Sequence, residues 1–465
     1  VLRSSIDGRL QRRLETLATR HQRRLGDDGL TLAAVVIEHG EAAVRAYLGS
    51  GEYFAQAFPG QVDMLRAVRS PGSSLKPFIY GLGFDAGLIH PETLIEDRPG
   101  PVSGYAPGNF DRRYLGEIRV RQALVQSRNL PAVRLLDRLG PERFARRLQQ
   151  AGVRLRLPLA VERPGLPIAL GGVGVTLEEL GGLYAALAQR GRFRAPGLWA
   201  QAPEAPELAL LTPAAAWYLT DILAEVPLPA GFAPGPRRLA FKTGTSYGFR
   251  DAWCLGYGSR YTVAVWVGRP DGGYTPGLSG LGTAAPVLLE VFDLLPDPGV
   301  EPLLRARPPE VLSVVHRGLP AALQRFGDPA SRAMGITPAG SGPRIRYPPA
   351  GSLVELETRP EARIVVEASG GQPPYYWLLD GRYLAGSQER AVARIGGLER
   401  PPAGAGRAGR MGIQRAYRRE DGDRRLQRQA ALGPGSRRLR GDGERPARRR
   451  RGGSDARGQS PAHLA

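Results

Sequence analysis

Five short runs of apolar and β-branched residues stand in two groups, and this division limits the fold more than any other feature of the sequence. The runs are residues 30–37, 42–48, 239–242, 253–257 and 261–267. Their length and composition predict strands. Because His39-Gly40 separates the first two runs and Gly258-Ser259 separates the last two, each of these pairs is expected to form a hairpin.

The residues between the two groups, roughly 73–225, have the apolar periodicity of helices, as in 141–150 and 177–190. Two strands, a helical block and three strands predict an α+β fold, in which one antiparallel sheet is built from both ends of the domain. Such a sheet would bring together segments that are far apart in the sequence, around residues 73 and 242.

Lysine is almost absent from this basic chain. Of the 64 lysines and arginines, only Lys76 and Lys242 are lysines. A guanidinium stays protonated, whereas burial or a neighbouring cation allows a lysine to lose its proton and act as a base. The two lysines are therefore candidates for chemistry or for point-charge recognition, unless they are remnants of a biased composition.

Both lysines lie in short polar motifs. Ser73 precedes Lys76 by three positions, so on a helix the hydroxyl and the amine would share one face, with Cβ atoms about 5–6 Å apart. This arrangement places a nucleophile beside its base. Lys242 opens Lys-Thr-Gly, and Ser-x-Asn at 127–129 follows an amphipathic run, 118–124, that predicts a helix.

Each motif also has a purely structural explanation. Ser73 could cap a helix, Ser127 and Asn129 could satisfy loose carbonyls at a helix end, and Lys242 could be a charge on a strand edge. The three motifs in this order favour chemistry over these explanations.

Ser-x-x-Lys, Ser-x-Asn and Lys-Thr-Gly in this order resemble the signature of the penicillin-binding proteins and serine β-lactamases. Five further runs resemble the transpeptidase part of class A penicillin-binding proteins. They are residues 5–11, 60–64, 69–73, 107–111 and 169–173. The resemblance covers roughly residues 1–395, and it implies a five-stranded sheet flanked by helices, with Lys-Thr-Gly on an edge strand.

The resemblance also implies roles for the motif residues in peptidoglycan D,D-transpeptidation. Ser73 would attack the penultimate D-Ala of a D-Ala-D-Ala stem peptide, and Lys76 would take its proton. Ser127 would relay a proton to the leaving amine, and Asn129 would hold both the substrate amide and Lys76. An incoming amine would resolve the acyl-enzyme and form the cross-link.

The Lys-Thr-Gly strand is implied to bind substrate. Lys242 would supply a positive field near the substrate carboxylate, and Thr243 and Thr245, on either side of Gly244, would hydrogen-bond it. The backbone N–H groups of Ser73 and Thr245 would form the oxyanion hole.

Two alternative functions remain open. A D,D-carboxypeptidase or β-lactamase-like hydrolase would use water in place of the amine, and a class A β-lactamase would need a positioned glutamate, for which Glu162, Glu178 and Glu179 are candidates. A non-catalytic scaffold would bind β-lactam or peptidoglycan without turnover.

No metal or other cofactor is expected. The five histidines have no ligand spacing, and the single cysteine, Cys254, excludes an internal disulfide. Cys254 is expected to be a small buried hydrophobic residue rather than a nucleophile. The resemblance implies as partners the stem peptides of lipid II-derived glycan strands, β-lactam inhibitors and other cell-wall synthesis proteins.

We expect five parts in the chain. They are a linker at 1–29, a transpeptidase domain at 30–293, a Pro-rich linker at 294–335, a partial β-sandwich at 336–396, and an Arg/Gly-rich tail at 397–465. In the sandwich, 353–357 and 362–368 are expected to be strands, and Asp380-Gly381 is expected to lie in a hairpin. This part resembles the C-terminal domain of the same family.

The tail cannot build a core, because residues 401–465 hold 17 arginines, 12 glycines and 6 acidic residues but no Val, Phe or Trp. It is expected to be disordered. An anion-binding arm and a tail that touches lipid or cell-wall polymer are alternatives, and we favour a frame-shifted reading of a GC-rich gene. No specific binding of nucleic acid is expected, since the arginine runs lack interleaved aromatic residues.

No run of 18 or more apolar residues occurs in the sequence. The resemblance implies a membrane anchor and a glycosyltransferase domain before residue 1. The chain is therefore expected to be a fragment that works at the periplasmic face of the inner membrane.

Overall fold

The computed structural model describes two stretches of the chain, each with gaps: residues 3–327 and residues 344–415. The described residues are 3–26, 29–51, 53–54, 60–199, 206–233, 238–296 and 302–327, together with six strands between 344 and 415. The chain divides into a unit of residues 1–415 and a unit of residues 416–465, and the second unit lies outside the described residues.

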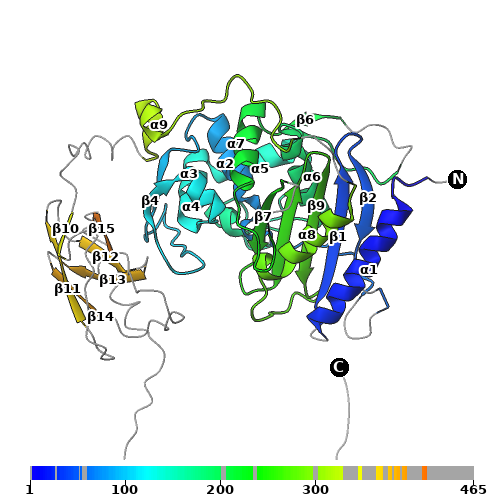
Figure 1. Ribbon diagram of the computed structural model, residues 1–465, viewed down its shortest axis with the longest axis horizontal. Helices are drawn as coiled ribbons and strands as arrows, with labels where there is room; N and C mark the ends of the chain where they lie inside the picture. Colours follow the sequence, from blue (N-terminus) through cyan, green and yellow to red (C-terminus); the bar gives the residue numbers. More distant parts are fainter. Residues whose placement is uncertain are drawn as a thin grey trace, which may run out of the picture. The chain divides into compact units, whose positions relative to one another are not determined.

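A five-stranded antiparallel sheet forms the centre of the first stretch (Figure 1). Its strands, in spatial order, are β2 (Ala43–Leu48), β1 (Thr31–Glu38), β9 (Tyr261–Gly268), β8 (Asp251–Tyr257) and β7 (Ala240–Thr245). The pairing of β1 with β9, from Thr31 opposite Gly268 to Glu38 opposite Tyr261, joins the two groups of strands. The predicted α+β fold with one sheet built from both ends of the domain is confirmed.

Both faces of the sheet are covered, so side chains that alternate along β1 enter two separate cores. Leu32, Ala34 and Val36 pack in a core with residues of the helices α1 (Gly8–Leu25) and α8 (Ala285–Leu294). Ala33, Val35 and Ile37 pack on the other face, in a core shared with α6 (Leu177–Ala188). This double cover explains why every residue of β1 is buried.

The second core continues into a helical region between β2 and β7, as the periodicity predicts. Its remaining elements are α2 (Lys76–Asp85), β3 (Leu94–Asp97), β4 (Gly116–Arg119), α3 (Val120–Val125), α4 (Asn129–Leu139), α5 (Pro141–Gln150), β5 (Arg192–Phe193), β6 (Leu208–Ala209) and α7 (Pro213–Leu223). The helix expected over 141–150 has those bounds. The run 118–124 instead begins in β4 and continues as α3.

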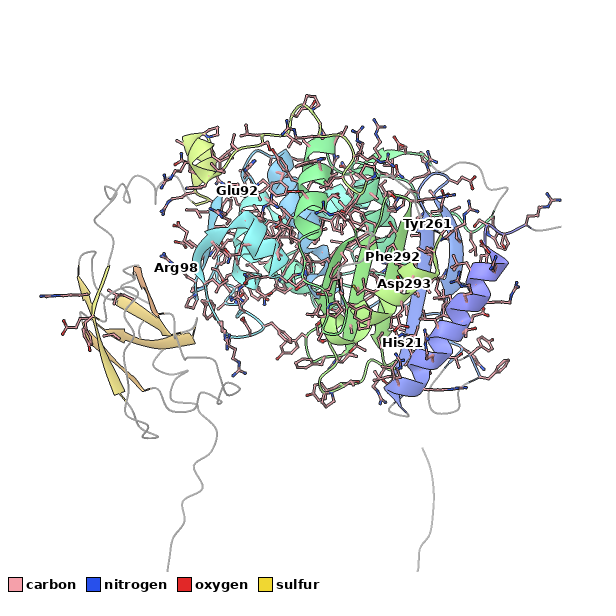
Figure 2. The ribbon with its side chains drawn as sticks, in the orientation of Figure 1. His21, Glu92, Arg98, Tyr261, Phe292 and Asp293 are labelled. Atoms are coloured by element: carbon pink, nitrogen blue, oxygen red, sulfur yellow. The ribbon has the colours of Figure 1, made fainter. Side chains whose placement is uncertain are left out.

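The first 29 residues differ from the expected linker, because they contain the 18-residue helix α1. The Asp7 side chain accepts hydrogen bonds from the N–H groups of Arg9 and Leu10, which caps the helix. Leu10, Leu14 and Leu17 turn one face towards the sheet. Figure 2 labels His21 on α1 and Phe292 on the neighbouring α8.

The strands beyond residue 343 form two three-stranded sheets. One has the order β10 (Arg344–Tyr347), β11 (Arg363–Ser369), β14 (Arg390–Arg394), and the other has the order β13 (Arg382–Ser387), β12 (Tyr375–Leu379), β15 (Met411–Arg415). The strand expected at 362–368 corresponds to β11, and the expected hairpin corresponds to the antiparallel pair β12 and β13. The strand expected at 353–357 lies outside the described residues.

One strand, β15, falls inside the segment 397–465 that was expected to lack order. It pairs with β12 along its length, from Met411 opposite Leu379 to Arg415 opposite Tyr375. Main-chain pairing needs no apolar core of its own, which is why composition did not predict this strand. The other residues of that segment lie outside the described part of the chain.

The short helix α9 (Ala321–Gln324) follows the segment 302–320. Among the helices of the described residues, none combines the length and the apolar character that a membrane crossing requires.

Candidate active site

The three motifs meet at the β7 edge of the sheet. Ser73 lies in a 3₁₀ turn (Gly72–Leu75) that leads into α2, and Lys76 is the first residue of that helix. Ser127 lies between α3 and α4, and Asn129 begins α4. Lys242, Thr243, Gly244 and Thr245 belong to β7, which is an edge strand as expected.

Lys76 joins the first motif to the second. Its side chain is buried, and Nζ donates hydrogen bonds to the Ser127 main-chain oxygen at 2.7 Å and to Asn129 Oδ1 at 2.6 Å. Beyond these two hydrogen bonds, an ammonium would have one further N–H donor, and a neutral amine would have a lone pair in its place. Within the described residues no hydrogen bond is recorded for Ser73 Oγ, so the hydroxyl of the expected nucleophile is not engaged elsewhere.

Lys242 joins the third motif to the second. Nζ donates to Ser127 Oγ at 2.8 Å and to the Thr243 main-chain oxygen at 2.7 Å, and the side chain is 1% exposed. Ser127 therefore lies between the two lysines, with its hydroxyl on Lys242 and its carbonyl on Lys76. Of the two lysines, Lys242 contacts the Ser127 hydroxyl and Lys76 contacts only its main-chain carbonyl.

Burial makes both amines weaker bases than an exposed lysine. Burial lowers the pKa of Lys76 well below its usual range, and the positive charges of Lys242 and Arg128 lower it further, while Asp97 opposes them. Burial lowers the pKa of Lys242 to about 7. A lowered pKa favours the neutral amine, which is the form that can act as a general base.

The turn before Ser73 depends on a glycine. Gly72 has φ +53°, and a Cβ atom there would lie 2.4 Å from the carbonyl oxygen and 2.9 Å from the nitrogen of Thr245. The main chains of Gly72 and Thr245 are therefore in contact. This contact places the turn that carries Ser73 against the β7 main chain, where the oxyanion hole is expected.

Residues that the motifs do not include support this turn. Ser70 Oγ donates to the Gly171 main-chain oxygen at 2.7 Å, and Trp253 Nε1 donates to the Ser70 main-chain oxygen at 2.8 Å. Gly171 has φ +90°, and a Cβ there would lie 2.5 Å from the Gly72 nitrogen. The runs 69–73 and 169–173 signal this region in the sequence, whereas nothing local signals Trp253.

Ser127 is strained in a way the sequence did not reveal. Its φ is +55°, and the N–H groups of Ser127 and Arg128 donate to the carbonyls of Leu124 and Ala123 at 3.0 and 2.9 Å. These two bonds form a Schellman motif, in which the left-handed residue after the helix is usually glycine. A serine at this position pays about 1–3 kcal/mol of backbone strain and keeps its hydroxyl in the site.

The glutamates considered for a β-lactamase-type water are placed as follows. Glu179 forms the capping box of α6 with Thr176 and receives Arg156 Nη1 at 2.6 Å, and Glu178 lies 3.7 Å from Arg66 Nε. Glu162 is exposed. No hydrogen bond joins any of the three to the motif residues in the described part of the chain.

Cys254 lies on β8 opposite Thr243 and is fully buried. Burial raises the pKa of its thiol, so the thiolate that a nucleophile requires is disfavoured. Among the described residues no group of three or more His, Cys, Asp or Glu side chains has the arrangement of a metal site. A cavity of about 1130 Å³ lies beside α1 and β2, at the opposite edge of the sheet, and the motif residues do not line it.

The domain family described as "Penicillin binding protein transpeptidase domain" matches residues 32–290, which is more than half of the chain. The chain belongs to this family. A second family, "Penicillin-Binding Protein C-terminus Family", matches residues 335–396. The resemblance to class A penicillin-binding proteins and the expected fold class are thereby confirmed, and so is the expected class of enzyme domain, a serine-type penicillin-binding transpeptidase domain.

Similar proteins carry the same family name. Penicillin-binding protein 1C of Escherichia coli is 43% identical over 296 residues, which are 63% of this chain and 38% of that protein. Penicillin-binding protein 1F of Bacillus subtilis is 30% identical over 257 residues, 51% of this chain and 35% of that protein. This chain spans little more than a third of the length of these relatives.

Solved structures agree on the fold. The PonA1 protein of Mycobacterium tuberculosis in complex with penicillin V superimposes with a TM-score of 0.54 at 24% identity, over 66% of this chain and 91% of that chain. The penicillin-binding protein PonA1 gives a TM-score of 0.55 at 23% identity, over 68% of this chain and 90% of that chain.

Proposed function

We propose that this chain is a peptidoglycan D,D-transpeptidase that forms an acyl-enzyme on Ser73. The observation that carries the proposal is the hydrogen-bonded series from Asn129 through Lys76 and Ser127 to Lys242, which closes one site from three separate motifs. A serine beside a buried amine, with a second hydroxyl on a second amine, is suited to acyl transfer.

In the acylation step, Ser73 Oγ attacks the carbonyl carbon of the penultimate D-Ala, and its proton passes to Lys76 Nζ. The tetrahedral oxyanion lies between the N–H groups of Ser73 and Thr245. The C–N bond to the terminal D-Ala then breaks, and the leaving amine receives a proton through Ser127 Oγ. The products are the acyl-enzyme and free D-Ala.

The hydroxyls of Thr243 and Thr245, together with Lys242, bind the carboxylate of the substrate. Thr243 and Thr245 are partly exposed on the edge strand, and Thr245 Oγ1 accepts from the Gly280 N–H at 3.1 Å, which leaves its own proton for the substrate. Lys242 precedes them on β7 and supplies positive charge when it is protonated. The amine of a second stem peptide attacks the acyl-enzyme, the ester bond breaks, and Ser73 recovers its proton.

We propose stem peptides of lipid II-derived glycan strands as substrates, β-lactams as inhibitors and other cell-wall synthesis proteins as partners. We further propose that the chain works at the periplasmic face of the inner membrane, as part of a longer class A protein. The bounds of the transpeptidase domain at 30–293, the Pro-rich linker at 294–335 and the partial β-sandwich at 336–396 remain predictions.

The test is labelling with fluorescent penicillin, read on a denaturing gel, for the parent and Ser73→Ala. A stable band in the parent that Ser73→Ala abolishes is the expected result. Rapid loss of the label would favour the hydrolase, and no label in a folded parent would favour the non-catalytic scaffold. A second assay supplies a D-Ala-D-Ala stem peptide with a D-amino acid acceptor, and the transpeptidase predicts the exchanged peptide over the hydrolysed one.

A further inference from the structure

A buried carboxylate outside the three motifs connects the loop at 107–115 with the turn that carries Ser127 and Asn129. Asp97 ends β3, and its side chain is fully buried. Oδ1 accepts from Asn109 Nδ2 at 2.7 Å, and Oδ2 accepts from Arg128 Nε at 2.8 Å and from the Leu115 N–H at 3.0 Å. The carboxylate therefore accepts three hydrogen bonds, from two different segments of the chain.

Arg128 is the middle residue of Ser-x-Asn, and its guanidinium is almost fully buried, at 6% exposure. Besides Asp97, it contacts Asp111 Oδ2 at 2.9 Å and the Arg113 main-chain oxygen. These contacts fix the main chain between two residues of the motif. Without Asp97, this buried guanidinium would retain only the half-exposed Asp111 as a counter-charge.

Asn109 carries the other half of the connection. Its Oδ1 accepts from the Asn129 main-chain N–H at 2.8 Å, and the Gly108 main-chain oxygen accepts from Asn129 Nδ2 at 2.7 Å. Lys76 Nζ donates to Asn129 Oδ1, so the orientation of the Asn129 amide is determined. If the amide were flipped, its Nδ2 would face the Lys76 donor and its Oδ1 would face the Gly108 carbonyl oxygen. The second Nδ2 proton is thereby held ready for a substrate carbonyl.

We propose that the buried Asp97 carboxylate is a positioning group for acyl transfer, which acts through Arg128 and Asn109 on the Ser-x-Asn motif. It orders the left-handed Ser127 through the guanidinium and the Asn129 amide through the loop at 107–113. It also offsets the charge of Arg128 close to Lys76. This inference rests on the proposed function, since the motif that it positions is the one proposed to handle substrate.

The charge on Lys76 responds to groups from four elements. Lys242 faces it from β7, Arg128 from the turn between α3 and α4, Asp97 from β3, and the neutral Asn129 from α4. Asp97 is the group that raises the pKa of Lys76, so its neutralisation would lower that pKa further. The acid limb of the pH–rate profile, which reports loss of the neutral base, would then move to lower pH.

The experiment measures the rate constant of acylation by fluorescent penicillin from pH 5 to pH 9 for the parent, Asp97→Asn and Asp111→Asn. Asp97→Asn removes one charge without a change of size and is expected to slow acylation about 10- to 100-fold, because small misplacements of catalytic groups cost this much. Its acid limb is expected to move to lower pH. Asp111→Asn is the matched control, since that carboxylate binds the same guanidinium but is 45% exposed. Its acylation rate constant is expected to fall less than about threefold, because an exposed ion pair contributes little.

Arg128→Lys separates geometry from charge. It retains the positive charge but loses the planar fork, so acylation is expected to slow while the acid limb stays near that of the parent. Equal rates and equal pH profiles for the parent and Asp97→Asn would overturn the inference. A fall in the labelled fraction with an unchanged rate constant and profile in the labelled molecules would also overturn it, because that is the result of a purely structural role. A folded parent that is not acylated would instead reject the proposed function.

Discussion

Lys242 Nζ donates a hydrogen bond to Ser127 Oγ over 2.8 Å, although the two residues are 115 positions apart in the sequence. The bond joins the edge strand of the sheet to the turn between α3 and α4. It leaves the Ser127 hydroxyl proton free to move, because the hydroxyl oxygen is the acceptor.

Ser127→Ala is expected to slow penicillin acylation about 10²- to 10⁴-fold, the usual contribution of a proton-transfer group. The measurement is the acylation rate constant with labelled penicillin. Ser103→Ala is a matched control, because Ser103 also has a positive φ, at 44°, and its hydroxyl also makes one hydrogen bond, to Asp137. A similar loss in both variants would contradict the proton-relay role.

Lys76→Arg is expected to reduce acylation by about 10³-fold or more, because a guanidinium keeps the charge but cannot accept the proton from Ser73. Lys242→Arg is the comparison, since the proposed role of Lys242 is a positive charge beside the substrate carboxylate. The Lys242→Arg variant is expected to retain part of the acylation activity. Equal residual rates in the two variants would argue against separate roles for the two lysines.

Gly72→Ala is expected to abolish most labelling, because its Cβ would lie 2.4 Å from the Thr245 carbonyl oxygen and would push the nucleophile turn away from β7. Gly87→Ala tests the backbone alone: Gly87 has φ +61° and open space around it. Both variants carry the strain of a left-handed alanine, about 1–2 kcal/mol. Labelling per folded molecule should fall only in Gly72→Ala, with folding checked by circular dichroism.

Stability should rise with pH between about 7 and 9. The pKa of Lys242 is about 7 in the folded chain and near its usual value of 10.5 after unfolding, so within this interval the unfolded chain binds the extra proton. Each such group adds up to about 1.4 kcal/mol per pH unit, and Lys76 changes stability in the same direction. Lys242→Met should therefore reduce the slope of the free energy of unfolding, measured by urea denaturation at pH 7, 8 and 9. An unchanged slope would mean that Lys242 is protonated in the folded chain.

Cys254→Ala should leave acylation within about twofold of the parent and lower the free energy of unfolding by about 1 kcal/mol through the lost packing of a small side chain. The thiol should not react with a thiol reagent in the folded chain, because it is fully buried. Loss of penicillin labelling in Cys254→Ala, with folding intact, would contradict the assignment of the nucleophile to Ser73.

Much of the fold could be predicted from the sequence because its signals are local. The apolar, β-branched runs of β1, β2, β8 and β9 and the turn residues between them predicted two hairpins, and the periodicity of 141–150 predicted α5 with its observed bounds. The helix α1 was missed, although its leucines at 10, 14 and 17 and the cap residue Asp7 are ordinary signals of an amphipathic helix. The motif residues were found because their order is distinctive even without a structure.

The positioning residues could not be found in this way. Nothing local to Asp97 indicates that its carboxylate will meet Arg128, which lies 31 positions away, or that Asn109 will join them. The positive φ of Ser127 could not be predicted either, since the residue types at the end of a helix seldom indicate which residue is left-handed when none of them is glycine.

The sequence by itself determined the α+β class, the pairs of strands and the identity of the two lysines, because hydrophobic periodicity and residue chemistry act over a few positions. Only the tertiary structure decided that both amines are buried, that Lys242 rests on Ser127, and that a carboxylate from β3 offsets Arg128. Those properties depend on burial and on distances between segments far apart in the chain, and pKa shifts follow from that environment rather than from the residue type.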